Sequence, residues 1–149
     1  MKAAESKVTG DEAQIREIIE DYGEGLKNRD AGRCVAHYAD DIVQFDLAPP
    51  LEFRGKETAE KNLSEWFKTF DGPIGFEMKE LTISAGADTA FAHVFNHISG
   101  THNGQANDHW VRVTICFRKT DGKWLVTHEH VSVPFYMDGS FRAAMDLKP

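Results

Sequence analysis

The segment Val111–Phe135 reads VRVTICFRKTDGKWLVTHEHVSVPF and predicts two long strands joined by a tight turn. Thr120-Asp121-Gly122 is a hairpin turn signal, because aspartate and glycine accept the positive φ angles that short hairpin turns require. Apolar and polar residues alternate on both sides of the turn, which is typical of partly buried strands. The C-terminal half of the chain is therefore predicted to contain an antiparallel sheet.

The second strand of this hairpin spaces two histidines and a serine at intervals of two. Side chains alternate across a strand, so Trp124, Val126, His128, His130 and Ser132 are predicted to share one face. Leu125, Thr127, Glu129, Val131 and Val133 are predicted to share the other. A turn centred on Asp121-Gly122 would pair Arg118 with Trp124, Cys116 with Val126, Thr114 with His128, Arg112 with His130 and Trp110 with Ser132.

This register gathers a polar patch on one sheet face, made of Trp110, Arg112, Thr114, His128, His130 and Ser132. The patch is either a solvated outer face or the wall of a pocket. Valines and a leucine on the opposite face mean that neither face is plainly solvent-facing. Burying an arginine and two histidines without partners would cost several kcal/mol, so such groups usually form a network or a ligand site. We therefore favour the pocket.

A metal site is the sharper alternative. The His128-Glu129-His130 spacing puts two imidazoles on one side of a strand, and Asp46 or His97 could add a third ligand. His93 and His97 lie four residues apart on their own strand, roughly 13 Å, which is too far for joint ligation. The sequence contains no second ligand pair with short spacing, so we expect no tightly held metal and no cofactor.

The rest of the chain predicts three helices followed by a sheet. Thr9-Gly10-Asp11-Glu12 has capping-box spacing, and Ile15, Ile18, Ile19, Tyr22 and Leu26 then recur at helical spacing. Asp30 caps a predicted second helix that ends near Ala39-Asp40-Asp41. A third helix after Gly55 carries Ala59, Leu63, Trp66, Phe67 and Phe70 on one face. The predicted strands are 42–47, 74–84, 89–99, 108–119 and 123–134, which makes an α+β domain.

Composition limits the function further. The chain has 149 residues, the size of a single domain (1–149), and a net charge of −7. It has no basic run for phosphates, so nucleic acid is an unfavoured partner. No apolar segment approaches the ~20 residues of a membrane span. The N-terminal residues also lack the apolar core of a signal peptide, which predicts a soluble cytoplasmic protein without membrane partners.

Tyr22 on the first helix, Tyr38-Ala39-Asp40-Asp41 leading to Asp46, and the closing hairpin together resemble the nuclear-transport-factor-2-like superfamily. The resemblance covers nearly the whole chain and is strongest for the SnoaL-like ketosteroid isomerase homologues. It implies a cone of curved antiparallel sheet wrapped around three helices, with a cavity at the open end. In the steroid isomerases the matching tyrosine donates to an oxyanion and the matching aspartate is the general base. The hairpin position of their second, protonated aspartate matches Thr114 here.

The favoured hypothesis is a cofactor-independent isomerase or lyase that moves a proton beside a carbonyl of a small or polyketide-like molecule. Asp46 would be the base, Tyr22 and His130 the oxyanion donors, and Arg112 an anchor for an acidic group. Trp66, Trp110, Thr114, His128 and Ser132 would line the substrate pocket. The alternatives are a non-catalytic binding or dimerisation module and a metal-assisted enzyme using His128 and His130.

A homodimer is also expected. Val111, Val113, Leu125 and Val131 are predicted to lie on the outer face of the open sheet. A sheet face with several exposed apolar residues usually marks an interface between subunits.

Overall fold

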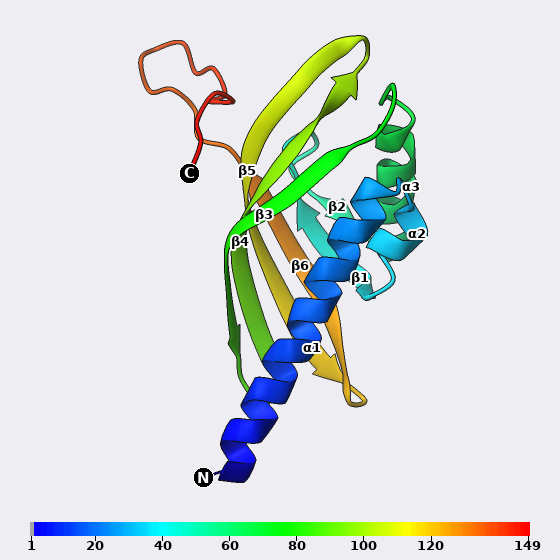
Figure 1. Cartoon of the computed structure of the whole chain (residues 1–149), viewed down its shortest axis with the longest axis vertical. Helices are drawn as coiled ribbons and strands as arrows, with labels where there is room; N and C mark the ends of the chain where they lie inside the picture. Colours follow the sequence, from blue (N-terminus) through cyan, green and yellow to red (C-terminus); the bar gives the residue numbers. More distant parts are fainter. Residues whose placement is uncertain (1) are drawn as a thin grey trace.

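The computed structural model describes residues 2–149, with side chains from residue 10 onward. Three helices lie on one side of a curved six-stranded sheet, and α1 crosses its concave face (Figure 1). The helices are α1 (Lys2–Lys27), α2 (Ala31–Cys34) and α3 (Lys56–Phe67). The strands are β1 (Tyr38–Phe45), β2 (Phe53–Arg54), β3 (Gly75–Ala85), β4 (Thr89–His102), β5 (Gln105–Thr120) and β6 (Lys123–Ser132). The predicted α+β class is confirmed.

The sheet order is β2-β1-β6-β5-β4-β3. Neighbouring strands pair antiparallel, except that β1 runs parallel to β6. A parallel pair needs a long crossover, and here β2, α3 and strands β3 to β5 all lie between the two partners in the chain. The first strand of the sheet is thereby brought beside the last one, which places the residues after β1 next to the end of the hairpin.

Two predicted element boundaries near the N-terminus are wrong. The chain is already helical from Lys2, so α1 does not begin at the predicted capping box. Thr9 lies outside the residues whose side chains are described. The second helix is a single turn, and Tyr38, which was assigned to it, begins β1. The predicted cap of that turn is confirmed, because the Arg33 amide donates to Asp30 Oδ1 over 3.0 Å.

A β-bulge in the closing hairpin decides which residues of β6 face the helices. Asp121 and Gly122 both have positive φ, and Thr120 pairs with Lys123, as the turn signal predicts. The register then shifts between Cys116 and Phe117, where Thr127 is the extra residue of a β-bulge.

The bulge reverses the side-chain alternation along the second half of β6. Trp124 and Val126 are buried against the helices, and after the bulge it is Glu129 that is buried, whereas His130 is exposed. Cys116 pairs with His128, Thr114 with His130 and Arg112 with Ser132. The predicted register, and the predicted common face for Trp124 and the two histidines, are therefore wrong.

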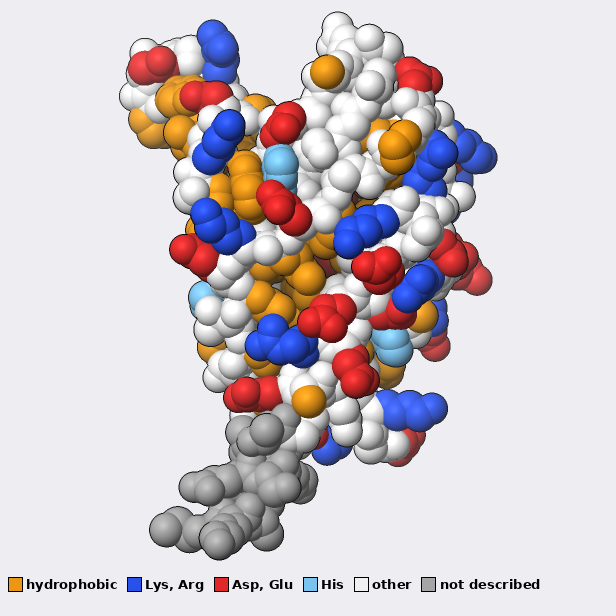
Figure 2. Space-filling model, viewed as in Figure 1, with side chains coloured by type: hydrophobic (Ala, Val, Ile, Leu, Met, Phe, Trp, Pro, Cys, Tyr) orange, Lys and Arg blue, Asp and Glu red, His pale blue; other side chains and the backbone are white. Residues whose placement is uncertain are grey.

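The hydrophobic core lies between α1 and the concave face of the sheet. α1 approaches β3 closely at Gly23, where a Cβ atom would lie 2.8 Å from the Phe76 ring. Among the helices of the described residues, none is long and apolar enough to cross a membrane. The segment after β6 exposes Phe135, Met137 and Phe141, and Figure 2 shows hydrophobic side chains gathered there (upper left).

A buried carboxylate fastens α1 to the closing hairpin. Asp11 is 5% exposed, and its Oδ1 accepts from Lys119 Nζ and from Trp124 Nε1, each over 3.0 Å. A buried acceptor shared by an ammonium and an indole N–H holds the helix at a fixed position along the hairpin.

We expect Asp11→Ala to lower the free energy of unfolding by about 2–3 kcal/mol, because it leaves the buried indole N–H of Trp124 without this acceptor. Asp11→Asn keeps an acceptor for Trp124 and should cost less. Urea denaturation of both variants measures the difference. An Asp11→Ala protein as stable as the parent would contradict this role.

Candidate functional site

A cavity of about 500 Å³ lies between the concave face of the sheet and the helices. Most of its wall is apolar, with side chains from α1, α3 and the four central strands. The polar residues that line it are Tyr22, His37, Tyr38, Gln44, Asp46, Asn62, Glu65, Asn96, His102, Asn107, His109 and Glu129. Within the described part of the chain, no lysine or arginine lines this cavity. A concave apolar site with a few polar groups is typical of small-molecule binding.

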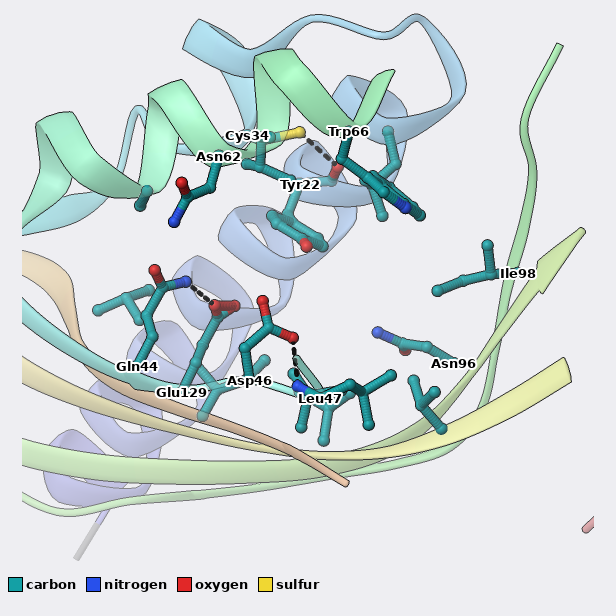
Figure 3. A pocket seen from close by; sticks show the side chains of 18 of the residues that line it. Tyr22, Cys34, Gln44, Asp46, Leu47, Asn62, Trp66, Asn96, Ile98 and Glu129 are labelled. Carbon is teal, nitrogen blue, oxygen red and sulfur yellow. Dashed lines mark hydrogen bonds between the residues drawn. The ribbon is translucent and has the colours of Figure 1, made fainter. Parts of the chain in front are cut away.

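Glu129 on β6 is a buried carboxyl group in the cavity wall, 7% exposed. The Tyr38 hydroxyl lies 2.9 and 2.8 Å from its two oxygens, and Gln44 Nε2 donates to Oε2 over 3.0 Å. Figure 3 shows Gln44 and Glu129 side by side in the wall. Burial raises the pKa of Glu129 above its ordinary value, and this effect outweighs the opposing hydrogen bonds from Tyr38 and Gln44. Glu129 is thus a carboxyl group that tends to keep its proton.

Asp46 follows β1 and is the second carboxyl group of the cavity. It is exposed, and its Oδ1 accepts the Leu47 amide over 2.7 Å. The other carboxylate oxygen points into the cavity, on the side of Glu129 and Tyr22 (Figure 3). Asp46 therefore lies where the cavity meets solvent, with one oxygen directed at any bound molecule.

Tyr22 projects from α1 into the same space, with its hydroxyl directed towards the cavity (Figure 3). Its ring packs edge-on against Phe76, with centroids 6.5 Å apart. Burial raises the pKa of Tyr22 well above its ordinary value. The phenol remains protonated at neutral pH and can donate a hydrogen bond to a ligand oxygen.

The structure brings three of the predicted site residues into the cavity, namely Tyr22, Asp46 and Trp66. It places the other six on the outer face of the sheet: Trp110, Arg112, Thr114, His128, His130 and Ser132. For the three β6 residues the physical reason is the bulge at Thr127, which turns Glu129 and Val131 inward in their place. The three β5 residues face outward because they alternate with Val111, Val113 and Ile115, which are buried and line the cavity. The prediction that this polar patch is a pocket wall is wrong.

The outer-face residues have partners of their own. Arg112 Nε donates to Ser132 Oγ over 3.1 Å, and the His128 ring lies 2.7 Å, Nδ1 to O, from the Val43 carbonyl. Trp110 stacks on His97 with centroids 4.6 Å apart, which also places His97 on this face. Thr114, matched to the second aspartate of the steroid isomerases, is exposed on β5, so its predicted place in the substrate pocket is wrong.

The alternative metal site lacks its third ligand. His128 and His130 have ring centroids 6.4 Å apart, and Phe45 packs edge-on against both rings. Asp46 lies in the cavity, and His97 is held between Glu77 and Asp108. Across the residues with described side chains, no group of three or more His, Cys, Asp or Glu residues has an arrangement that could hold a metal ion.

The sequence analysis missed Glu129, Gln44 and Asn96 as cavity residues. For Glu129 a signal was available, because one acidic residue alternates with Val131 and Val133 on the same predicted face. A carboxylate among valines is costly unless the site uses it. Asn96 alternates in the same way with Val94 and Ile98 on β4. For Gln44 no comparable signal exists, since its environment depends on the parallel pairing of β1 with β6.

Three comparisons place the chain among known proteins. A family model described as SnoaL-like domain matches residues 15–136. A search among curated protein sequences found no match. Among solved structures, an NTF2-like protein of unknown function from Pseudomonas putida KT2440 is 37% identical, with a TM-score of 0.86 over 95% of this chain and 98% of that chain.

Two more distant structures share the fold. A putative dehydratase from the NTF2-like family of Streptomyces avermitilis is 16% identical, with a TM-score of 0.72 over 84% of this chain and 97% of that chain. A ketosteroid isomerase-like protein from Erwinia carotovora atroseptica SCRI1043 is 23% identical, with a TM-score of 0.68 over 80% and 93%. The matched domain spans most of the chain and its helices and sheet form the cavity described above, so the chain belongs to the SnoaL-like domain family.

Proposed function

We propose that the protein catalyses a cofactor-independent proton transfer next to the carbonyl group of a small, largely apolar molecule. The observation that carries the proposal is a pair of carboxyl groups in one cavity, Glu129 buried and Asp46 exposed. Two carboxyl groups in different environments can divide the work of acid and base. The names of related structures, a putative dehydratase and a ketosteroid isomerase-like protein, support this class of chemistry.

Each group has one role in the proposed step. Asp46 removes a proton from the carbon next to the carbonyl, and the electron pair of the broken C–H bond forms the enolate. Tyr22 and protonated Glu129 donate hydrogen bonds to the oxygen on which negative charge develops. Protonated Asp46 then returns its proton to carbon, either at the original position or at a conjugated one, which gives exchange or isomerisation.

The charge of the wall sets the substrate class. Asp46, Glu65 and Glu129 line the cavity, and no lysine or arginine among the described lining residues balances them. Arg112, predicted to anchor an acidic substrate group, lies on the outer face and cannot do so. We therefore propose an uncharged ketone, since a carboxylate or phosphate would meet the carboxylates of Asp46 and Glu65 without a lysine or arginine to bind it.

The test is proton exchange by the parent protein. Deuterium uptake from D₂O into a panel of neutral enolisable ketones, followed by NMR, should be faster with protein than in buffer at the same pH. Binding is measured in parallel by fluorescence of the cavity residue Trp66. If ketones bind and none exchanges faster than in buffer, proton transfer is wrong and the protein is a small-molecule binding module.

We also propose that the chain forms a homodimer through the outer face of the sheet. Val111, Val113 and Val131 do not belong to that face, because all three line the cavity. The outer face carries other large side chains instead: Phe91 on β4 is 47% exposed, and Trp110, further along the same face on β5, is partly exposed. An open sheet face with exposed aromatic residues is a typical interface.

Sedimentation at micromolar concentration should give the mass of two chains. Phe91→Lys, which adds a charge to the outer face without touching the cavity, should shift the distribution towards one chain. A parent protein that sediments as a monomer would contradict the dimer.

A further inference from the structure

Asn96 is a polar residue without a role in the proton transfer described above. It lies on β4, is 7% exposed and lines the cavity. Its nearest partners across the sheet are Met78 on β3 and Val111 on β5, both apolar. Among the described residues its Oδ1 is the buried side-chain oxygen that has no hydrogen-bond partner. Figure 3 shows the Asn96 amide pointing into the cavity.

A buried amide oxygen without a hydrogen-bond partner lowers the stability of the fold. An unsatisfied polar atom away from water typically costs about 1–3 kcal/mol, and buried polar atoms are rarely left so. Turning the amide about its last torsion exchanges its nitrogen and oxygen but leaves one of them facing apolar wall. Nothing in the described protein fixes that torsion, so either half of the amide is available to a molecule in the cavity.

The strand register gives the position of Asn96 relative to the acid pair. Asn96 is opposite Val111 and Glu129 is opposite Ile115, both on β5. Four residues along a strand correspond to roughly 13 Å, and β4 and β6 flank β5 at ~4.8 Å on either side. The two polar positions therefore lie on opposite sides of β5 and far apart along the cavity floor. Val113, which is buried and lines the cavity, lies between them on β5.

We propose that Asn96 is a second polar subsite, which binds a hydroxyl group at the far end of a neutral ketone built on fused rings. A hydroxyl can donate to Oδ1 or accept from Nδ2, so it suits either orientation of the amide. The apolar floor between Asn96 and Glu129 fits a ring system. An acidic group is disfavoured there, because no lysine or arginine lies among the described lining residues. The carbonyl end of this assignment rests on the proposed function.

The test compares 2-tetralone, a bicyclic ketone, with 6-hydroxy-2-tetralone, which adds a hydroxyl on the ring far from the carbonyl. Dissociation constants are measured for the parent, for Asn96→Leu and for Asn62→Leu. Asn62 is the matched control, because it is a cavity asparagine on α3, on the opposite wall, next to Gln44 (Figure 3). The hydroxyl should tighten binding about tenfold in the parent and in Asn62→Leu, and not in Asn96→Leu.

Equal affinity of the parent for the two ketones, absence of binding, or the same gain in Asn96→Leu would overturn the subsite. Thermal unfolding confirms that the variant is folded. Asn96→Leu should raise Tm by about 2–4 °C, because it removes an unpaired buried group. If the hydroxyl tightens binding but no ketone exchanges deuterium, proton transfer is refuted and the Asn96 subsite stands. If ketones exchange deuterium but the hydroxyl does not tighten binding, the Asn96 subsite is refuted and proton transfer stands.

Discussion

Replacing Asp46 with asparagine is expected to slow deuterium exchange next to the carbonyl of a bound ketone by ~10²-fold or more. The amide keeps the shape of the side chain and the acceptor for the Leu47 amide, but it cannot take up the proton. Affinity for the ketone, followed by Trp66 fluorescence, should change much less. The expected result is therefore a loss of rate at nearly constant binding.

Asp41→Asn is the matched control for this experiment. Asp41 lies on β1, is exposed and does not line the cavity, so the same chemical change should leave exchange at the parent rate. An Asp46→Asn protein that binds the ketone and exchanges protons as fast as the parent would refute the base assignment. Glu129, the other carboxyl group near the ligand, would then be the candidate base.

Glu129→Gln is expected to change how stability depends on pH. Burial raises the pKa of Glu129 above its ordinary value of 4.5. The folded protein therefore holds this proton more tightly than the unfolded chain does. Stability from that proton is fully present below the unfolded pKa and is lost as pH rises through the folded pKa. Glutamine at 129 has no proton to lose, so the variant should gain stability relative to the parent across that window.

Urea denaturation at a series of pH values measures this difference. The gap between Glu129→Gln and the parent should widen upward from pH ~4.5, by at most about 1.4 kcal/mol per pH unit, and then level off. Glu17→Gln, an exposed position on α1, is the control and should follow the parent. A constant gap at all pH values would show that Glu129 titrates alike in the folded and unfolded chain.

Most of the architecture could be predicted from the sequence, because it depends on patterns that are local. The helical stripe from Ile15 to Leu26, the long alternating strands and the Asp121-Gly122 turn each fix an element without reference to the rest of the chain. The cavity positions of Tyr22, Asp46 and Trp66 followed from the helical stripes and from the family resemblance. Tyr22 and Trp66 lie on helices, whose side-chain directions do not depend on strand register.

The inward position of Glu129 could not be predicted, because it depends on one extra residue, Thr127, which forms a bulge in β6. The bulge at Thr127 leaves Trp124 and Val126 inward and moves every later side chain of β6 to the opposite face. An uninterrupted period-two assignment misses such a shift, because it extends the face of Trp124 and Val126 to His128 and His130, although the valines at 131 and 133 lie on the other face. His128 and His130 attracted the functional interpretation, and Glu129 between them is the residue in the cavity wall.

Pairing between strands that are distant in the sequence explains why the lengths of α2 and β1 were predicted wrongly. The single turn of α2 and the early start of β1 at Tyr38 reflect the parallel pairing with β6, in which Tyr38 lies opposite Val126. The Tyr38 hydroxyl reaches Glu129 only because these two strands are neighbours. Local helical preference around Cys34 could not compete with that pairing.

Central to the proposed chemistry is that Glu129 keeps its proton where an ordinary glutamate is ionised. The most direct measurement is a pH titration of its side-chain carboxyl carbon by ¹³C NMR, with the signal assigned by its loss in Glu129→Gln. We expect the Glu129 signal to remain that of the protonated acid above pH 4.5 and to titrate only at higher pH. A Glu129 carboxyl that titrates at or below its ordinary pKa would contradict its role as a hydrogen-bond donor to the enolate oxygen.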